Sequence, residues 1–357
     1  MNIPHIQSIL EKLTNLETNK AFDFQNIHIN GDEVALEVVL AYPAKSQFES
    51  IREQIQAAIV KKYPQAQVHI GIETKIIAHK VQNNLKPLPG IKNIIAIASG
   101  KGGVGKSTTA VNIALALHQE GASVGILDAD LYGPSQPLML GLSNQMPNVL
   151  PNQKMQAPEN YGIKVMSIGF LIQTDDTPMI WRGPMVSATL EQILNQTEWG
   201  ELDYLIVDLP PGTGDAQLTL SQKVPLSGAV IVTTPQDIAL IDAKKGLKMF
   251  EKVNIPILGI VENMSLFVCP KCQAESAIFG KGGADKMQQE YGVTILGKLP
   301  LSLSIRENAD SGKPSVIADS ASSESAIYKK IARQIAIQIA LRPKDYSAKL
   351  PKVVVEN

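Results

Sequence analysis

The chain has 357 residues, of which 44% are hydrophobic, enough for two globular domains with sizeable cores. Its 33 lysines and arginines nearly balance 34 aspartates and glutamates, so no global charge attracts nucleic acid or an anionic membrane surface. No apolar run approaches the ~20 residues that span a bilayer, and the N-terminus lacks the basic and apolar blocks of a secretory signal. We therefore expect a cytoplasmic protein with no nucleic acid and no membrane as partner.

Residues 1–82 are predicted to form a small α/β domain. The chain opens with an apolar stripe at helical spacing, made of Ile6, Ile9, Leu10, Leu13 and Leu16. Residues 34–40 alternate as a half-buried strand after a turn at 30–32, and a second helix and a further strand are expected over 46–62 and 68–72. The expected order of elements is αββαβ.

This order resembles the MIP18-like (DUF59) domain, and residues 31–43 (GDEVALEVVLAYP) are the best-matching segment. The acidic Asp-Pro-Glu signature often seen early in that domain is absent, because Leu-Thr-Asn-Leu-Glu stands near its expected place at 13–17. His28, His69 and His79 are isolated on strand-like or linker segments, which favours structural or solvated roles. We assign this domain no chemistry.

A linker with two prolines and a glycine is predicted over residues 83–90, followed by a large domain over 91–342 and a C-terminal tail over 343–357. In the large domain, short apolar runs alternate with helical segments. The strand candidates are Ile94–Ala98, Val124–Leu127, Lys164–Ile168, Tyr204–Val207, Ala229–Thr233, Ile257–Val261 and Thr294–Leu299. Continuous apolar runs indicate strands covered on both faces, so we expect an α/β fold with a doubly wound, mostly parallel sheet.

A glycine-rich stretch lies between the first of these strands and a helical segment, and it matches GxxxxGK[ST] in full. Its glycines let successive N–H groups point at one phosphate group, and the helix N-terminus adds partial positive charge. Lys106 is placed to reach the β- and γ-phosphates, and the Ser107 hydroxyl to bind Mg²⁺. The predicted nucleotide-binding residues are Gly100, Lys101, Gly102, Gly103, Val104, Gly105, Lys106, Ser107 and Thr108.

Lys101 is an additional lysine directly after the first glycine of this stretch. The resulting KGGxGK[ST] variant resembles the deviant Walker A motif of the MinD, ParA and nitrogenase-reductase group of P-loop ATPases. In that group the extra lysine reaches nucleotide bound to the other subunit. The resemblance therefore implies a homodimer that forms around ATP.

Three further strand ends carry polar residues that fit the same group. Asp128 and Asp130 follow the second strand, where the resemblance implies that Asp130 positions or activates the attacking water and Asp128 supports the Mg²⁺ shell. Asp208 follows the fourth strand as a Walker B aspartate, which holds Mg²⁺ through water. Asn263 follows the sixth strand and resembles the residue that reads the adenine edge. The catalytic candidates are thus Lys101, Lys106, Asp130 and Asp208.

Cys269 and Cys272, in Cys-Pro-Lys-Cys, are the chain's only cysteines. One CxxC supplies two thiolates, whereas a tetrahedral zinc or a cubane iron-sulfur cluster needs four ligands. Two copies of the chain can supply four thiolates if the cysteines lie near the two-fold axis of a dimer. A bridging 4Fe-4S cluster, a bridging zinc, a thioredoxin-like redox pair and an inert cysteine pair all remain open at this point.

Taken together, these motifs closely resemble the Mrp/ApbC family of P-loop iron-sulfur cluster carrier ATPases. The similarity runs from about residue 94 to residue 318 and includes residues 128–137, 181–184, 210–218, 261–264 and the Cys-Pro-Lys-Cys element. The family implies a homodimer that binds a labile 4Fe-4S cluster between subunits, receives it from a scaffold and delivers it to apo-proteins. It also implies ATP binding or slow ATP hydrolysis at the loading or release step.

Two further segments of the sequence are interpreted as ordinary structural elements. Ile327, Ile331, Ile335 and Ile339 form a ridge at i, i+4 spacing, for which packing against the sheet is preferred over membrane binding. The stretch Phe279-Gly-Lys-Gly-Gly283 lacks the closing GK[ST], so we interpret it as an ordinary loop. The alternative functions are a positioning ATPase like MinD or ParA, which would need a membrane helix or a basic DNA face, and a nucleotide-switched dimer with structural zinc.

Overall fold

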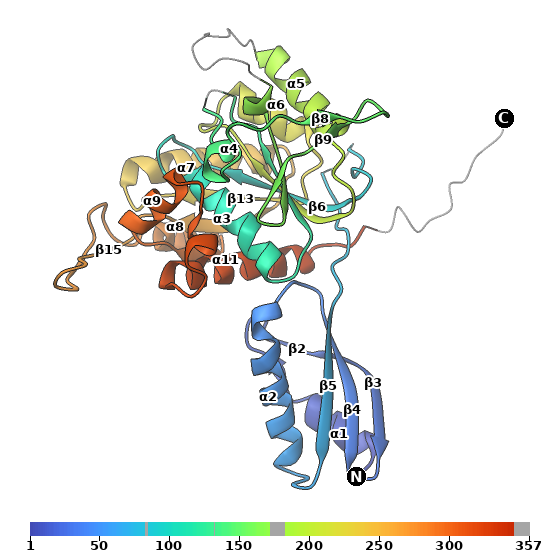
Figure 1. Ribbon diagram of the computed structural model, residues 1–357. Helices are drawn as coiled ribbons and strands as arrows, with labels where there is room; N and C mark the ends of the chain where they lie inside the picture. The colour runs from blue at the N-terminus through green and yellow to red at the C-terminus, as the bar shows by residue number, and fades with distance from the viewer. Residues whose placement is uncertain (83–84, 132, 172–182, 346–357) are drawn as a thin grey trace. The chain divides into compact units, whose positions relative to one another are not determined.

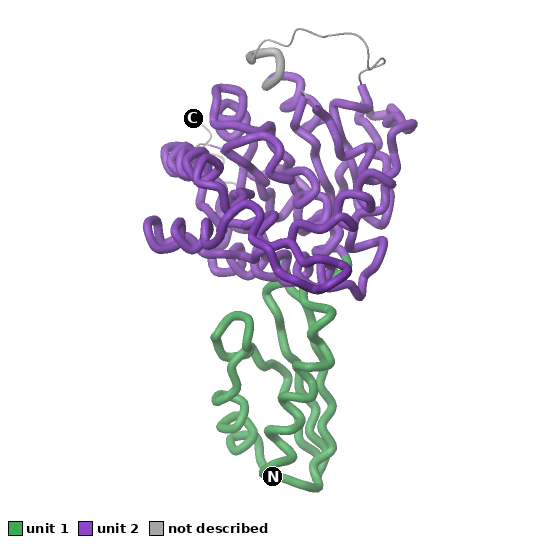
Figure 2. The backbone as a smooth tube through the Cα atoms, turned by 90° about the vertical axis from the view of Figure 1, so that its left-hand side faces the viewer, with its two compact units in different colours: residues 1–77, 119–121 green, residues 78–118, 122–357 purple. Residues whose placement is uncertain are grey.

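The structure is a computed structural model that describes residues 1–82, 85–131, 133–171 and 183–345 (Figure 1). The chain divides into two compact units, which Figure 2 shows in green and purple. The small unit holds Met1–Ile77 and Gln119–Gly121, and the large unit holds Ala78–His118 and the chain from Ala122 onward. Residues 83–84 of the expected linker, and 346–357 of the expected tail, lie outside the described residues.

The small unit has the expected αββαβ order with one additional hairpin of two-residue strands. Its elements are α1 (Ile3–Leu10), β1 (Thr14–Asn15), β2 (Lys20–Ala21), β3 (Asp23–Asn30), β4 (Glu33–Leu40), η1 (Lys45–Gln47), α2 (Phe48–Val60) and β5 (Gln67–Thr74). The strand order is β3-β4-β5, with β4 antiparallel to β3 and parallel to β5. Every second residue of β4 is buried, as the alternation of its side chains requires.

The expected apolar stripe of the first helix is wrong beyond Leu10, where α1 ends. Leu16 is 81% exposed and lies in a turn between β1 and β2. Asn15 holds this turn, because its Oδ1 accepts a hydrogen bond from the backbone N–H of Glu17 at 2.9 Å. Asn side chains stabilise turns in this way and compete with the helix.

The large unit is built on an eight-stranded sheet with the order β10-β11-β7-β12-β6-β13-β14-β17. These strands are β6 (Ile91–Ala98), β7 (Val124–Asp128), β10 (Glu159–Asn160), β11 (Ile163–Ser167), β12 (Leu202–Asp208), β13 (Gly228–Thr233), β14 (Ile257–Glu262) and β17 (Ile295–Lys298). All pairs are parallel except β10 with β11. Each of the seven predicted strands is present, and the doubly wound α/β fold is confirmed.

Helices flank this sheet (Figure 1). They are α3 (Lys106–Gln119), α4 (Gln136–Met139), α5 (Gly183–Gln196), α6 (Asp215–Lys223), α7 (Asp237–Lys252), α8 (Gly283–Tyr291), α9 (Leu303–Asp310), α10 (Ser315–Ala318) and α11 (Ser323–Ala340). Three short elements, β8 (Asn148–Val149), β9 (Met155–Gln156) and η2 (Ile168–Phe170), lie in connections, and the hairpin β15 (Phe267–Val268) with β16 (Glu275–Ser276) follows β14.

The isoleucine ridge belongs to α11, which contacts β14 and β17. Ile331, Ile335 and Ile339 are buried there, which confirms the packing interpretation. Within the described part of the chain, no helix is both long enough and apolar enough to cross a membrane.

The parallel order of the strands brings their carboxyl ends to one edge of the sheet. Asp208 pairs in register with Asp128 on one side, and with Ile97 of β6 on the other. Ligands of open α/β sheets bind at this edge. The polar residues that follow β6, β7, β12 and β14 are therefore gathered where a nucleotide site is expected.

Candidate functional site

The loop between β6 and α3 has the close contacts that its glycines permit. Gly105 has φ +82°, and a Cβ there would lie 2.2 Å from Nδ2 of Asn263. A Cβ on Gly100 would lie 2.2 Å from the backbone carbonyl carbon of Asp242. Both positions need glycine, because the neighbouring chain occupies the space of a side chain. The loop is thus held between the ends of β6 and β14 and the start of α7.

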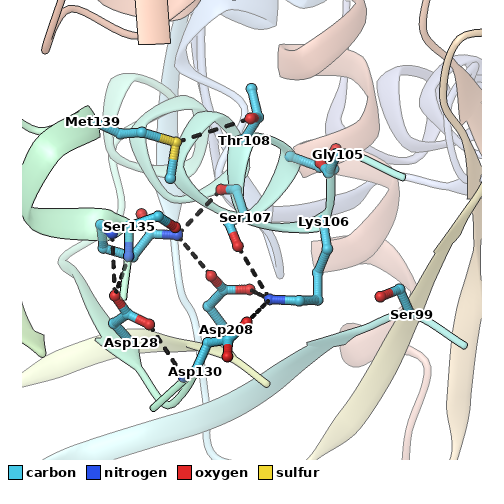
Figure 3. A network of polar contacts seen from close by, with 12 residues as sticks. Ser99, Gly105, Lys106, Ser107, Thr108, Asp128, Asp130, Ser135, Met139 and Asp208 are labelled. Carbon is cyan, nitrogen blue, oxygen red and sulfur yellow. Dashed lines mark hydrogen bonds and ion pairs between the residues drawn. The ribbon is translucent and has the colours of Figure 1, made fainter. Parts of the chain in front are cut away.

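Lys106 is the cationic centre of the site (Figure 3). Its ammonium group contacts the carboxylate of Asp208, donates to Ser107 Oγ at 3.1 Å and lies 3.8 Å from Asp130 Oδ2. Lys106 is 5% exposed and Asp208 is fully buried. Because buried charges need partners, this ion pair links the phosphate-binding loop to the end of β12.

Gln136, the first residue of α4, is a site residue that the sequence did not single out. Its Nε2 donates to Asp208 Oδ2 at 2.9 Å and to the backbone oxygen of Ser107 at 3.1 Å. Its Oε1 is buried and has no hydrogen-bond partner among the described residues. The available signal was its position within residues 128–137, a segment that resembles the carrier family.

Asp128 organises the loop after β7. Its carboxylate accepts hydrogen bonds from the backbone N–H groups of Asp130, Ser135 and Gln136 at 3.1, 3.0 and 3.1 Å, and from the Ser167 hydroxyl at 3.1 Å. Burial, and secondarily the negative charge of Asp208, raises the pKa of Asp128 to about 7. The carboxylate of Asp128 thus accepts hydrogen bonds from the loop that carries Asp130. A contribution of Asp128 to a Mg²⁺ shell stays a prediction.

Asn263 lies against the phosphate-binding loop. Its Nδ2 donates to the backbone oxygen of Val104 at 2.9 Å, and its Oδ1 accepts from the backbone N–H of Met264 at 2.9 Å. Its own N–H donates to Thr233 O at 2.7 Å, which holds it at the edge of the sheet. The structure thus brings Asn263 together with the phosphate-binding loop, whereas its expected role in reading adenine stays a prediction.

Lys101 stands apart from this network. It is exposed, and its backbone oxygen accepts a hydrogen bond from Ser99 Oγ at 2.9 Å. An exposed lysine at the tip of the loop has the freedom to reach a group outside its own chain. Its expected role across a dimer stays a prediction.

The loop at residues 279–283 has a structural role. The N-terminus of α8, which begins at Gly283, is occupied by the chain's own carboxylate, because Glu262 Oε2 accepts from Ala284 N at 2.7 Å. A Cβ on Gly283 would lie 2.8 Å from Pro235 Cα, so the glycine is required by close packing. These contacts agree with the interpretation of this stretch as an ordinary loop.

The two cysteines lie at the turn of the β15–β16 hairpin, which extends away from the sheet (Figure 1). The turn is closed by a hydrogen bond from Cys269 N to Ala274 O at 3.0 Å. Both thiols are free, with Cys269 partly exposed and Cys272 exposed. Hydrogen bonds from the backbone N–H groups of Cys272 and Lys271 lower the pKa of the Cys269 thiol.

This hairpin presents two thiols, which is half of the ligand set that a four-thiolate metal centre requires. Among the residues that the structure describes, no group of three or more His, Cys, Asp or Glu side chains is placed to hold a metal ion. The chain contains no cysteine besides Cys269 and Cys272. A four-thiolate centre therefore needs ligands from another chain.

The fold and the site define a class of protein. A glycine-rich loop between the central strand β6 and α3, with Lys106 paired to Asp208 at the end of a neighbouring parallel strand, is the arrangement of a P-loop NTPase. The family described as NUBPL iron-transfer P-loop NTPase matches residues 90–336, and the domain described as iron-sulfur cluster assembly protein matches residues 23–70. The chain belongs to this family of iron-sulfur cluster carrier and transfer proteins, and the resemblance noted from the sequence is confirmed.

Two named relatives are similar over most of the chain. The iron-sulfur cluster carrier protein of Escherichia coli (strain K12) is 49% identical over 325 residues, covering 91% of this chain and 87% of its own length. The iron-sulfur cluster transfer protein NUBPL of Mus musculus is 53% identical over 260 residues, covering 72% of this chain and 81% of its own.

Solved structures agree with the fold. The nucleotide-binding protein from Archaeoglobus fulgidus, in complex with ADP, is 39% identical with a TM-score of 0.57, covering 63% of this chain and 88% of its own. The cell division ATPase MinD of Pyrococcus furiosus is 23% identical with a TM-score of 0.52, covering 68% of this chain and 98% of its own, and supports the fold alone. Trp181 and Arg182, part of the resemblance, lie outside the described residues.

Proposed function

We propose that this protein is an ATP-dependent carrier that holds a labile 4Fe-4S cluster between two copies of the chain and transfers it to apo-proteins. The observation that carries the proposal is the cysteine hairpin. It presents two free thiols at an accessible turn, and backbone N–H groups favour the thiolate of Cys269. Thiolates are the ligands of iron-sulfur clusters, and a turn that stabilises them before metal arrives suits cluster uptake.

The cluster is the cargo of this carrier and not a resident cofactor. A cubane needs four thiolates, and one chain supplies Cys269 and Cys272. A homodimer completes the ligand set symmetrically. Because half of the ligands leave when the two copies separate, the cluster is easily released to an apo-protein. Free thiols and a labile cluster both require a reducing compartment, which supports a cytoplasmic location.

The residues of the phosphate-binding loop fit ATP with Mg²⁺. The backbone of residues 100–105 and the N-terminus of α3 suit the phosphates. Oxygen ligands suit Mg²⁺, and the hydroxyl of Ser107 lies beside Asp208 together with the buried Oε1 of Gln136, which has no hydrogen-bond partner in the described part of the chain. When bound, Mg²⁺ neutralises charge on the phosphates. Lys106 then stabilises the developing negative charge, Asp130 positions the attacking water, and Asp208 orients the surrounding waters.

Nucleotide state regulates cluster release in this proposal. Asp130 and the segment after Asp208 are the switch regions, and both lie at the edge of the sheet that also holds Asn263. ATP shifts the carrier between two dimer geometries only if it binds them with different affinity. Each 1 kcal/mol of differential binding changes their ratio about fivefold. Slow hydrolysis then resets the carrier, and a scaffold protein supplies the next cluster.

Anaerobic reconstitution with iron and sulfide tests this function. The wild-type protein is expected to bind about four irons per dimer with the spectrum of a cubane. The variant with Cys269→Ala and Cys272→Ala is expected to bind none, whereas Ser276→Ala in the same hairpin retains the cluster. Transfer is then measured as activation of an apo-protein that depends on a 4Fe-4S cluster. Tightly held zinc in place of iron, or a cluster that survives loss of both cysteines, contradicts the proposal.

A further inference from the structure

Gln136 is buried and joins three parts of the candidate nucleotide site. Its side-chain Nε2 donates to Asp208 Oδ2 at 2.9 Å and to the backbone oxygen of Ser107 at 3.1 Å. Its backbone N–H donates to Asp128 Oδ2 at 3.1 Å. The start of α3, the end of β12 and the loop after β7 therefore meet at one residue.

The contacts of the Gln136 amide fix the direction in which it faces. The Asp208 carboxylate and the Ser107 carbonyl are both acceptors, and only the nitrogen end of the amide can donate to them. The oxygen end, Oε1, is buried and accepts no hydrogen bond from the residues that the structure describes. Buried polar atoms are nearly always hydrogen-bonded. This oxygen therefore calls for a donor that the described part of the chain does not supply.

The charges around Gln136 favour a hydrated cation as the source of that donor. The carboxylates of Asp208 and Asp130 share one ammonium group, that of Lys106 (Figure 3). In the proposed function Lys106 serves the phosphates of ATP, and a buried carboxylate that loses its cation is strongly destabilised. A divalent cation that keeps part of its water shell supplies both the missing charge and O–H donors. An ordinary buried water would supply the donor alone.

We propose that Gln136 is a positioning residue for Mg²⁺, whose Oε1 accepts a hydrogen bond from a water of the metal's shell and whose backbone N–H ties that shell to the loop carrying Asp130. The inference rests on the proposed function, because it takes ATP and Mg²⁺ to bind at this site. Mg²⁺ in proteins usually keeps several of its waters. A side chain that accepts from them strengthens metal binding without touching the metal.

The connection to Asp130 runs through one carboxylate. Asp128 accepts from the backbone N–H of Asp130 with Oδ1 and from that of Gln136 with Oδ2, each at 3.1 Å. A Gln136 side chain that is held by the metal's shell therefore also holds the residue from which the attacking water is positioned in the proposed function. Mg²⁺ is expected to protect the backbone N–H of Gln136 from hydrogen exchange beyond what the nucleotide alone achieves.

Two substitutions of opposite character test this role. Gln136→Met keeps the length and the unbranched shape of the side chain and removes both of its polar ends. Gln136→Glu keeps an acceptor oxygen and places a second carboxylate beside Asp208. Gln192→Met, at an exposed glutamine on α5, is the matched control. Isothermal titration with ADP, in the presence and absence of Mg²⁺, gives the factor by which Mg²⁺ raises the affinity of each protein for ADP.

The Mg²⁺ factor is expected to fall about fivefold to tenfold in Gln136→Met, which corresponds to one lost hydrogen bond. The ADP affinity of this variant without Mg²⁺ is expected to match that of the wild type, which also shows that it is folded. In Gln136→Glu the factor is expected to rise about tenfold, because Mg²⁺ relieves the repulsion between two neighbouring carboxylates. Gln192→Met is expected to behave like the wild type. Hydrogen exchange of the peptide that contains Gln136 is expected to slow on addition of Mg²⁺ to the ADP complex of the wild type but not of Gln136→Met.

A Mg²⁺ factor that stays unchanged in Gln136→Met overturns the inference. An equal loss of ADP affinity with and without Mg²⁺ also overturns it and assigns Gln136 to the shape of the loop alone. If Gln136→Met does not fold, Gln136→Glu decides, and a factor that does not rise overturns the inference. A wild type that binds ADP equally well with and without Mg²⁺ contradicts the Mg²⁺ site of the proposed function, and the inference fails with it, whereas cluster uptake is decided separately by the reconstitution experiment.

Discussion

The side-chain amide of Asn263 donates a hydrogen bond to the backbone oxygen of Val104, over 2.9 Å, and so joins the end of β14 to the phosphate-binding loop. The same amide accepts a hydrogen bond from Met264, a residue with φ +56° at which the chain turns toward the cysteine hairpin. Ser265 then donates from its N–H to Leu299 O at 2.9 Å. One short covalent segment therefore leads from the candidate nucleotide site to the candidate cluster ligands.

Replacing Asn263 with alanine is expected to weaken ATP binding and to reduce the preference for ATP over GTP. The loss of one to two hydrogen bonds, each contributing about 1 kcal/mol, corresponds to about fivefold to thirtyfold in affinity. Isothermal titration with both nucleotides measures the effect, and Asn148→Ala, at an exposed position on β8, is the control. Equal loss of affinity for both nucleotides would show that Asn263 positions the loop without reading the base.

The buried Lys106 and the exposed Lys101 are expected to respond differently to substitution. Lys106→Ala leaves the carboxylates of Asp208 and Asp130 without their cation, so the free energy of unfolding is expected to fall by about 3 kcal/mol. Lys101→Ala removes an exposed side chain, so the free energy of unfolding is expected to stay unchanged. Urea unfolding of the nucleotide-free proteins measures both.

ATP hydrolysis separates the functional roles of the two lysines. Both substitutions are expected to reduce the rate about a hundredfold or more, because each lysine is proposed to place a cation on the transferred phosphoryl group. Full activity of Lys101→Ala would remove the argument for a contribution across a dimer. In the urea-unfolding experiment, the double variant with Asp208→Asn and Lys106→Ala is expected to recover part of the lost free energy of unfolding. The reason is that Asp208→Asn removes the buried negative charge that Lys106 paired.

Asp128 is expected to make stability depend on pH. Its pKa is about 7 in the folded chain, above its ordinary value of 3.8, so the folded state binds the proton more tightly. The stabilisation is full below the ordinary value and is lost as the pH rises through the folded value. From about pH 5 to about pH 8, wild-type stability is expected to fall relative to Asp128→Asn by about 2 kcal/mol.

This dependence is measured by urea unfolding of the nucleotide-free and metal-free proteins at several pH values. The substitution also changes the hydrogen bonds of the loop after β7, but that effect is a constant offset between the two curves. Only the difference in slope reports the titration of Asp128. Parallel curves for wild type and Asp128→Asn would contradict the assignment of a raised pKa.

The thiol of Cys269 is expected to ionise more readily than an ordinary cysteine. Its pKa is lowered by backbone N–H groups of the turn, which stay in place in a Cys272→Ser variant. The rate at which iodoacetamide alkylates this variant is measured against pH in metal-free buffer. The midpoint of that curve should lie at a lower pH than for a single cysteine whose amino and carboxyl groups are blocked. Unfolding in urea is expected to restore the ordinary midpoint. A midpoint that does not move on unfolding would exclude the turn as the cause.

Much of the fold could be predicted from the chain because its signals are local. Continuous apolar runs identify strands covered on both faces, and every predicted strand of the large sheet is present. The first helix shows where such signals fail. The apolar spacing of Leu13 and Leu16 continues beyond Leu10, but the helix ends at Leu10 and Leu16 lies in a turn that Asn15 holds. Periodicity records which positions are apolar, and it does not record competition from a polar side chain.

The sequence by itself determined the phosphate-binding loop and the cysteine pair, because the residues of each motif are close neighbours along the chain. Only the tertiary structure decided that Gln136 meets Asp208 and that Glu262 fills the N-terminus of α8. These contacts join residues far apart along the chain. They depend on the order in which the strands assemble into the sheet, and the pattern of side chains within a single strand carries no information about its neighbours.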